Sequence, residues 1–389
     1  MRPSRLAGMA GIGVDRMGDR ADAMKGRDFL RLENLDTDIP PHELVLAASR
    51  AAIAEDKNNS YLPFVGQMRL RDAAAAHVSR MTGVRYEGAK NVLISVGGLS
   101  GILNVLLTIV ETGDEVILTD PTYIGLINRV RLAGGVPKLV PFSKHDGGWA
   151  LDRDALKGAV TPKTRAFLMM SPSMPSGGYL TREDWVAIAD IARARELWIV
   201  NDTAMERILF DGRSVCHPAG FPGMADFVIT VGSASKELRL IGWRVGWIVA
   251  PARLVPDLAL VSMGNVVAPV GIAQDAVAMA LELGDQDVAR AVAILEERRN
   301  VILDELDEFP VRRPDGGWSL LIDASELSMS GAELSERLFD EAQIAATPMN
   351  GWGEVNGAQF LRFVFANEPV ARLQGIGARL RRALRARSR

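Results

Sequence analysis

The chain of 389 residues is poor in cysteine, histidine and aromatic residues, with one cysteine, four histidines and 6% aromatic residues. The lone Cys216 excludes an intrachain disulfide, so we expect a reducing compartment, the cytoplasm. No apolar run reaches the roughly 20 residues of a membrane-spanning helix, and we expect no membrane partner. The N-terminal segment is basic and glycine-rich without a continuous apolar stretch, which argues against a secretory signal. An arm or a short first helix is the expectation for residues 1–28.

Strong charge of either sign is also missing, because the formal net charge is −3. No stripe of lysine and arginine with interleaved aromatic residues is present, so we expect no nucleic-acid partner. Hydrophobic residues make up 48% of the chain, which is typical of a globular protein. The length suits a large domain joined to a smaller one better than a single core.

What the chain does contain is a series of short apolar runs from about residue 90 onward, separated by helical patterns or loops. Their hydrophobicity is continuous rather than alternating, which indicates strands covered on both faces, as in a mostly parallel α/β sheet. In such sheets ligands bind beyond the carboxyl ends of the strands. The seven predicted strands are 91–96, 115–120, 138–142, 165–170, 197–202, 227–231 and 246–250.

The most informative stretch follows the predicted strand 227–231. Ser233 and Ser235 come directly after it, then Lys236, and Arg244 lies further on between glycines. A lysine beyond a strand end can form a Schiff base, and hydroxyls with a guanidinium can hold a phosphate dianion. The alternative interpretation is a surface lysine in a turn.

With its Gly-Trp-Arg-Val-Gly continuation at 242–246, this stretch resembles the fold type I, class I and II aminotransferases, which use pyridoxal 5′-phosphate. The resemblance implies that Lys236 carries the cofactor as a Schiff base. It also implies that Ser233, Ser235 and Arg244 bind the cofactor phosphate.

Two further motifs follow predicted strands. The segment 96–101 ends a strand and opens a helix, so Gly98 and Leu99 offer backbone N–H groups to a phosphate, although most Gly-Gly turns are only turns. After the next strand comes Asp-Pro-Thr-Tyr, ending at Tyr123. The resemblance implies that this tyrosine stacks on the cofactor ring; the alternative is a core tyrosine.

Asp202 ends another predicted strand, where the family has Asp-x-x-Tyr. The resemblance implies that its carboxylate keeps the pyridine nitrogen protonated, which makes the ring an electron sink. Without the resemblance, an Asn-Asp pair after a strand would more often cap a helix.

Tyr61 and Arg362 complete the candidate set. The segment from Tyr61 to Arg71 resembles a family motif whose tyrosine reaches the phosphate of the neighbouring subunit, which implies a homodimer; simple packing is the alternative. Arg362 lies within an apolar run, and a buried guanidinium needs an anion. The resemblance implies a bidentate grip on the substrate α-carboxylate. An internal ion pair is the alternative.

The sharpest departures from the family are Met174 and Met205, which stand where the family has asparagine and tyrosine. Those residues hydrogen-bond the 3′-oxygen of the cofactor, and a thioether is a poor acceptor and no donor. Our hypothesis is a raised pKa of the aldimine on Lys236. Nearby residues or water could instead supply the missing bonds.

The resemblance extends from about Leu32 to the end of the chain and implies an α/β fold, PLP fold type I. We expect a large domain with a seven-stranded, mostly parallel sheet and a smaller α+β domain formed by both chain ends. The expected boundaries are 1–50 for the N-terminal arm and part of the small domain, 51–285 for the cofactor domain and 286–389 for the C-terminal small domain.

The implied activity is transfer of an amino group from an L-amino acid to a 2-oxo acid through the Schiff base on Lys236. We assign no metal ligand. A lyase, a decarboxylase or an amino-acid oxidase on the same scaffold is the alternative, suggested by the two methionines. Ammonia release would indicate a lyase and peroxide an oxidase.

Overall fold

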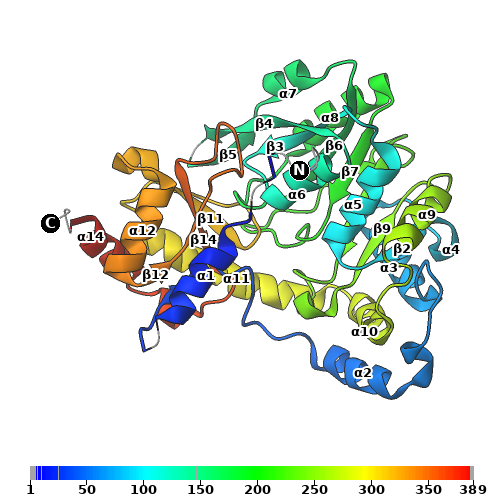
Figure 1. Ribbon diagram of the computed structural model, residues 1–389, viewed down its shortest axis with the longest axis horizontal. Helices are drawn as coiled ribbons and strands as arrows, with labels where there is room; N and C mark the ends of the chain where they lie inside the picture. The colour runs from blue at the N-terminus through cyan, green and yellow to red at the C-terminus, as the bar shows by residue number, and fades with distance from the viewer. Residues whose placement is uncertain (1–5, 7, 10, 25, 146, 386–389) are drawn as a thin grey trace.

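The structure, a computed structural model, describes residues 6, 8–9, 11–24, 26–145 and 147–385 (Figure 1). The expected arm at residues 1–5, 7 and 10 lies outside the described residues. Helix α1, Val14–Ala23, confirms a short helix near the start of the chain. Within the described ranges no helix is both long enough and apolar enough to cross a bilayer.

A large sheet of eight strands has the order β2-β9-β8-β7-β6-β3-β4-β5. Neighbouring strands from β8 to β4 are parallel, whereas β9 runs antiparallel to both β8 and β2. The strands are β2 Val92–Ser95, β3 Glu115–Asp120, β4 Val136–His145, β5 Gly148–Leu151, β6 Thr164–Met170, β7 Trp198–Asp202, β8 Val228–Ser233 and β9 Gly246–Val249.

All seven predicted strands are present, and the expectation of seven strands is corrected to eight. The additional strand is β5, which pairs antiparallel with the end of β4. Its residues alternate between half-buried and buried, and the part of β4 that it pairs with ends in polar residues. Neither segment forms a continuous apolar run, because the pair lies at the edge of the sheet.

Helices cover both faces of the large sheet, which explains the continuous apolar runs. Leu93 of β2 packs into one core with α5, α6 and α9, whereas its neighbours Val92 and Ile94 pack into another with α3 and α10. The helices of the large-sheet region are α2 Glu43–Ala54, α3 Met68–Thr82, α4 Gly88–Asn91, α5 Gly98–Ile109, α6 Ile124–Leu132, α7 Arg153–Ala159, α8 Arg182–Arg195, α9 Val255–Asn265 and α10 Gly271–Glu282.

A small antiparallel sheet has the order β10-β11-β14-β13 and lies near α12 and α14, away from α9 and α10 (Figure 1). The N-terminal segment joins this region, because β1 pairs in parallel with β12. Both ends of the chain therefore meet here. The elements are β1 Leu30–Arg31, α11 Gln286–Glu305, β10 Val311–Arg312, β11 Ser319–Asp323, α12 Gly331–Ala342, β12 Ile344–Ala345, β13 Thr347–Pro348, β14 Phe360–Val364, α13 Val370–Leu373 and α14 Ile376–Arg385.

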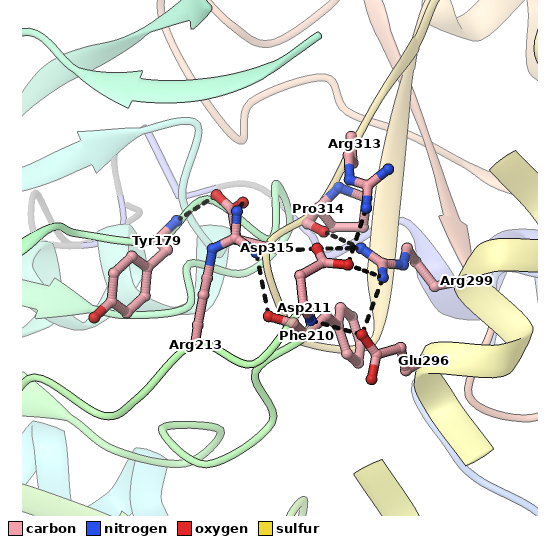
Figure 2. A network of polar contacts seen from close by, with 9 residues as sticks. All are labelled: Tyr179, Phe210, Asp211, Arg213, Glu296, Arg299, Arg313, Pro314 and Asp315. Carbon is pink, nitrogen blue, oxygen red and sulfur yellow. Dashed lines mark hydrogen bonds and ion pairs between the residues drawn. The ribbon is translucent and has the colours of Figure 1, made fainter. Parts of the chain in front are cut away.

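A polar network connects the loop after β7 with α11 and the segment before β11 (Figure 2). Both Oδ atoms of Asp211 accept hydrogen bonds from Arg299, at 2.9 and 2.8 Å, and Oδ1 also accepts one from Arg313 at 2.9 Å. These guanidinium groups, Arg299 first, hold the pKa of Asp211 well below its usual range. Arg299 is fully buried, so this network fixes α11 against the large-sheet region.

We predict that Arg299→Ala lowers the free energy of unfolding by about 3 kcal/mol, because it deletes a fully buried side chain together with its bonds to Asp211 and Glu296. Arg290→Ala on the same helix is the matched control. Arg290 is 70% exposed and pairs with Asp287, so its loss should cost less than about 1 kcal/mol. Urea denaturation of both variants is the measurement, and equal losses would contradict the prediction.

Candidate functional site

A cavity of about 220 Å³ lies where β2, β6, β7 and β8 reach their carboxyl ends. Eight of the ten candidate residues line it, whereas Tyr61 and Arg362 do not. Ligands of parallel α/β sheets bind at this edge, as the sequence predicted. The cavity is lined by Leu35, Gly98, Leu99, Tyr123, Met170, Met174, Asp202, Ala204, Ser233, Ser235, Lys236, Ile241 and Arg244.

One end of the cavity is formed by serine hydroxyls, Arg244 and the start of α5. The Ser233 and Ser235 hydroxyls lie 3.0 Å apart. Helix α5 begins at Gly98, so its first N–H groups have no partner within the helix and attract an anion. The Nη1 of Arg244 donates to the carbonyl of Ile241 at 2.7 Å, which orients the guanidinium. This end has the donors that a phosphate requires.

Glycines allow the backbone segments around these donors to approach closely. A Cβ added to Gly97, whose φ is +79°, would lie 2.5 Å from Nη2 of Arg244. A Cβ added to Gly246 would lie 2.7 Å from the backbone nitrogen of Gly98. Side chains at these two positions would therefore fill the space where Arg244 and the start of α5 come together.

The Lys236 amine lies beside the N-terminal segment and the small-sheet region. Its Nζ donates to the carbonyl of Leu35 at 3.0 Å and lies 4.1 Å from the centre of the Trp318 ring. Burial lowers the pKa of Lys236 to about 7, and the positive charges of Arg362 and Arg244 act in the same direction. A large share of the amine is therefore unprotonated near neutral pH.

Asp202 ends β7 and is buried. Burial raises the pKa of its carboxyl to about 6, although the N–H of Ala204 and the charge of Arg129 favour the ionised form. The Ala204 N–H donates to Oδ1 at 3.1 Å within a turn. Among the described residues no helix begins directly after β7, so Asp202 does not cap a helix as the alternative supposed. A cation placed against this carboxylate would favour its ionised form.

Arg362, on β14, is fully buried but lies outside the cavity lining. Its Nη2 donates to the carbonyl of Glu33 and to Oγ1 of Thr347, both at 3.1 Å. In the part of the chain that the structure describes, Nε and Nη1 have no hydrogen-bond partner. Burial lowers the pKa of Arg362 to about 10, whereas Tyr123 and Glu33 act to raise it. Two of its three nitrogens are thus buried without a hydrogen-bond partner among the described residues, which is costly unless an anion binds there.

The structure does not bring Tyr61 to the cavity of its own chain. Its side chain is 85% exposed, so the packing alternative does not describe it. Met174 lines the cavity, whereas Met205 is buried beside Gly317 and is not part of the lining. The hypothesis that these two methionines raise the pKa of the aldimine on Lys236 stays a prediction.

Three contributors to the site are absent from the predicted site residues. Leu35 acts through its carbonyl, which no side-chain pattern reveals. Trp318 precedes β11 and reaches Lys236 only through the fold. Arg129 on α6 donates from Nε to the carbonyl of Leu99 at 2.7 Å, and its charge acts on Asp202. Among the described residues, no group of three or more histidine, cysteine, aspartate and glutamate side chains could hold a metal ion.

Comparisons with known proteins point to one family. The family model described as aminotransferase class I and II matches residues 31–379. A probable N-succinyldiaminopimelate aminotransferase of Mycobacterium tuberculosis is 37% identical over 322 residues, which are 82% of this chain and 80% of that protein. Aromatic-amino-acid aminotransferase 2 of Thermococcus litoralis is 31% identical over 358 residues, 91% of this chain and 90% of that protein.

Solved structures agree with these matches. The structure of N-succinyldiaminopimelate aminotransferase from Mycobacterium tuberculosis has a TM-score of 0.89 and 32% sequence identity, covering 99% of this chain and 98% of that one. The aspartate aminotransferase from Rhizobium meliloti has a TM-score of 0.90 and 25% identity, covering 99% and 98% of the two chains.

We predict that in cofactor-free protein an amine-acylating reagent labels Lys236 with a half-maximal rate near pH 7, since burial and the two guanidinium groups lower its pKa to about 7. An ordinary lysine amine would reach that point only at about pH 10.4. The extent of labelling is measured by mass spectrometry of the Lys236 peptide across pH. Arg362→Met should move the midpoint upward, and a midpoint above pH 9 in the unaltered protein would contradict the assignment.

Proposed function

The chain belongs to the class I and II aminotransferase family, and from this membership we propose how its own residues carry out amino-group transfer. It is a pyridoxal 5′-phosphate-dependent aminotransferase of fold type I, and its substrates are an amino acid and a keto acid. The observation that carries the residue assignments is that Lys236, Asp202, Arg244 and the start of α5 line one cavity.

The residues around the cavity fit the cofactor. Arg244, the two serine hydroxyls and the N–H groups of Gly98 and Leu99 would hold its phosphate, in the space that Gly97 and Gly246 leave open. Asp202 would face the ring nitrogen and Tyr123 the ring itself. When bound, the cofactor withdraws electrons from the α-carbon of the substrate, which makes the α-proton removable.

Lys236 has two tasks in this proposal. Its Nζ is the atom to which the cofactor is covalently attached at rest. When the substrate amine takes that place, the Lys236 amine would be the base beside the α-carbon that takes up the α-proton and gives a proton back. A pKa near 7 suits both directions, because the amine can hold or release a proton near neutral pH.

Asp202 and Arg362 determine charge and orientation. The Asp202 carboxylate would keep a proton on the ring nitrogen, and that positive charge would in turn favour the ionised carboxylate. Arg362 would bind the α-carboxylate of the substrate through Nε and Nη1, which have no hydrogen-bond partner among the residues that the structure describes. This contact would hold the α-carbon near Lys236, whose pKa already responds to the charge of Arg362.

We favour amino-group transfer over elimination, decarboxylation or oxidation. The relatives described above are aminotransferases, and nothing in the comparisons supports one of the other reactions. The side chain of the donor is left to a substrate screen, because the names of the relatives cover acylated, aromatic and acidic amino acids.

We propose a homodimer, in which Tyr61 reaches the phosphate site of the partner. Its side chain is exposed, as are the apolar side chains of Leu44 and Ile53 on α2 and of Leu260 and Met263 on α9. Exposed apolar side chains that gather into a patch mark interfaces. The division into residues 1–50, 51–285 and 286–389 and a cytoplasmic location are also proposals, the former supported by the two sheets and by the pairing of β1 with β12.

The test of the proposed function is a screen of amino donors with the holoenzyme and with Lys236→Ala. We expect at least one L-amino acid to convert the cofactor absorbance to that of its amine form, with release of the matching 2-oxo acid. Lys236→Ala should slow this conversion by more than about 10³-fold, because no base is left for the α-proton. Ammonia or peroxide as the main product, or an undiminished rate in the variant, would overturn the proposal.

A second prediction concerns the phosphate end of the cavity. In Gly246→Ala the new Cβ would lie 2.6 Å from the carbonyl carbon of Gly97 and 2.7 Å from the nitrogen of Gly98, so the start of α5 must move. We expect the dissociation constant of pyridoxal 5′-phosphate to rise by about tenfold or more, the loss of about one good contact. The matched control is Gly242→Ala, whose Cβ would meet open space. An equal change in both variants would contradict the prediction.

A further inference from the structure

Asp120, the last residue of β3, binds a loop that comes from the other sheet. Its carboxylate is buried and accepts three backbone hydrogen bonds from the 350–357 loop, which connects β13 to β14. Oδ2 accepts from the N–H groups of Glu354 and Val355, each at 2.8 Å, and Oδ1 accepts from that of Asn356 at 3.0 Å. Both oxygens of a buried carboxylate are thus used to hold one loop.

Further bonds attach the same loop to the large sheet. The amide of Asn356 donates to the carbonyl of Asp120 at 2.9 Å and to that of Phe142 on β4 at 2.8 Å. The N–H of Thr122 donates to the carbonyl of Trp352 at 2.9 Å. A Cβ on Gly353 would lie 2.1 Å from Oδ1 of Asp120, so the loop can approach this closely only with glycine there.

The loop carries Trp352, which packs between two residues of the proposed site. Its ring is fully buried and meets the ring of Tyr123 edge-on, with 5.3 Å between centres. The guanidinium carbon of Arg362 lies 4.8 Å from the centre of the Trp352 ring. Among the described residues both hydrogen bonds of Arg362 involve Nη2 alone, and the indole face supports the rest of the guanidinium.

We propose that Asp120 is a positioning residue for the binding of the substrate α-carboxylate, acting through the 350–357 loop and Trp352 on Arg362. The inference rests on the proposed role of Arg362. Removing the carboxylate charge of Asp120 leaves backbone N–H groups of the loop without their acceptor, which is costly when they are buried. The loop and Trp352 then shift, and Arg362 loses the surface that orients it, although its own side chain is unchanged.

The test compares the holoenzyme with Asp120→Asn, using the best donor from the screen. An asparagine has the same shape, but its Nδ2 is a donor facing donors. We expect KM for the donor to rise about tenfold or more while kcat changes by less than about threefold. The 2-methyl form of the donor has no α-proton, so it binds without reacting further. Its dissociation constant, followed by cofactor absorbance, therefore measures binding alone and should rise by the same factor.

A second ligand separates positioning from general loosening. The amine that has the donor's side chain but no carboxylate does not use Arg362, so its dissociation constant should be unchanged in Asp120→Asn. Equal weakening of this amine and of the 2-methyl amino acid would overturn the inference, as would unchanged binding of both. Asp184→Asn is the matched control variant, because Asp184 is also buried and accepts the N–H of Thr181 at 2.9 Å, but at the start of α8. It should lower stability without changing KM.

Arg362→Gln tells failure of the inference from failure of the proposed function. If Arg362→Gln weakens binding of the 2-methyl amino acid and Asp120→Asn does not, the inference about Asp120 is wrong and the role of Arg362 stands. If Arg362→Gln leaves that binding unchanged, the proposed carboxylate site is wrong, and the inference about Asp120 falls with it.

Discussion

The burial of the Lys236 amine beside two positive charges is the constraint on which the site depends. Burial first, and then the charges of Arg362 and Arg244, lower the pKa of Lys236. Bringing such charges together is unfavourable unless the cavity receives negative groups. A cofactor phosphate at Arg244 and a substrate carboxylate at Arg362 would be two such groups. The arrangement thus favours the ligands of the reaction and at the same time keeps the amine reactive.

The topology of the large sheet creates this concentration of groups. The strands β3, β6, β7 and β8 run parallel, and β2 has the same direction because it is antiparallel to β9, which is antiparallel to β8. Tyr123, Asp202 and Lys236, together with the start of α5, therefore come to one edge although they are far apart in the sequence. Each of these strands has side chains packed in two cores, so this edge is held from both faces of the sheet.

The sequence predicted the parts of this site that follow their own strands. Lys236 and Asp202 stand next to buried apolar runs, so local pattern and sheet geometry place them together. The eighth strand was missed because edge strands such as β5 need no continuous apolar run. The contact of Asp120 with Glu354 joins residues 234 positions apart, and Leu35 acts through backbone alone. Neither relation has a pattern in a single sequence. Tyr61 is a different case, because its predicted contact is with a second subunit and its side chain is exposed in its own chain.

The short N-terminal segment after β1 contacts both Arg362 and Lys236. The carbonyl of Glu33 accepts from Arg362 and the carbonyl of Leu35, two residues later, accepts from Lys236. A substrate carboxylate bound at Arg362 would therefore act on the same short stretch of backbone that holds the Lys236 amine, so substrate binding and release of the lysine would be coupled through residues 33–35.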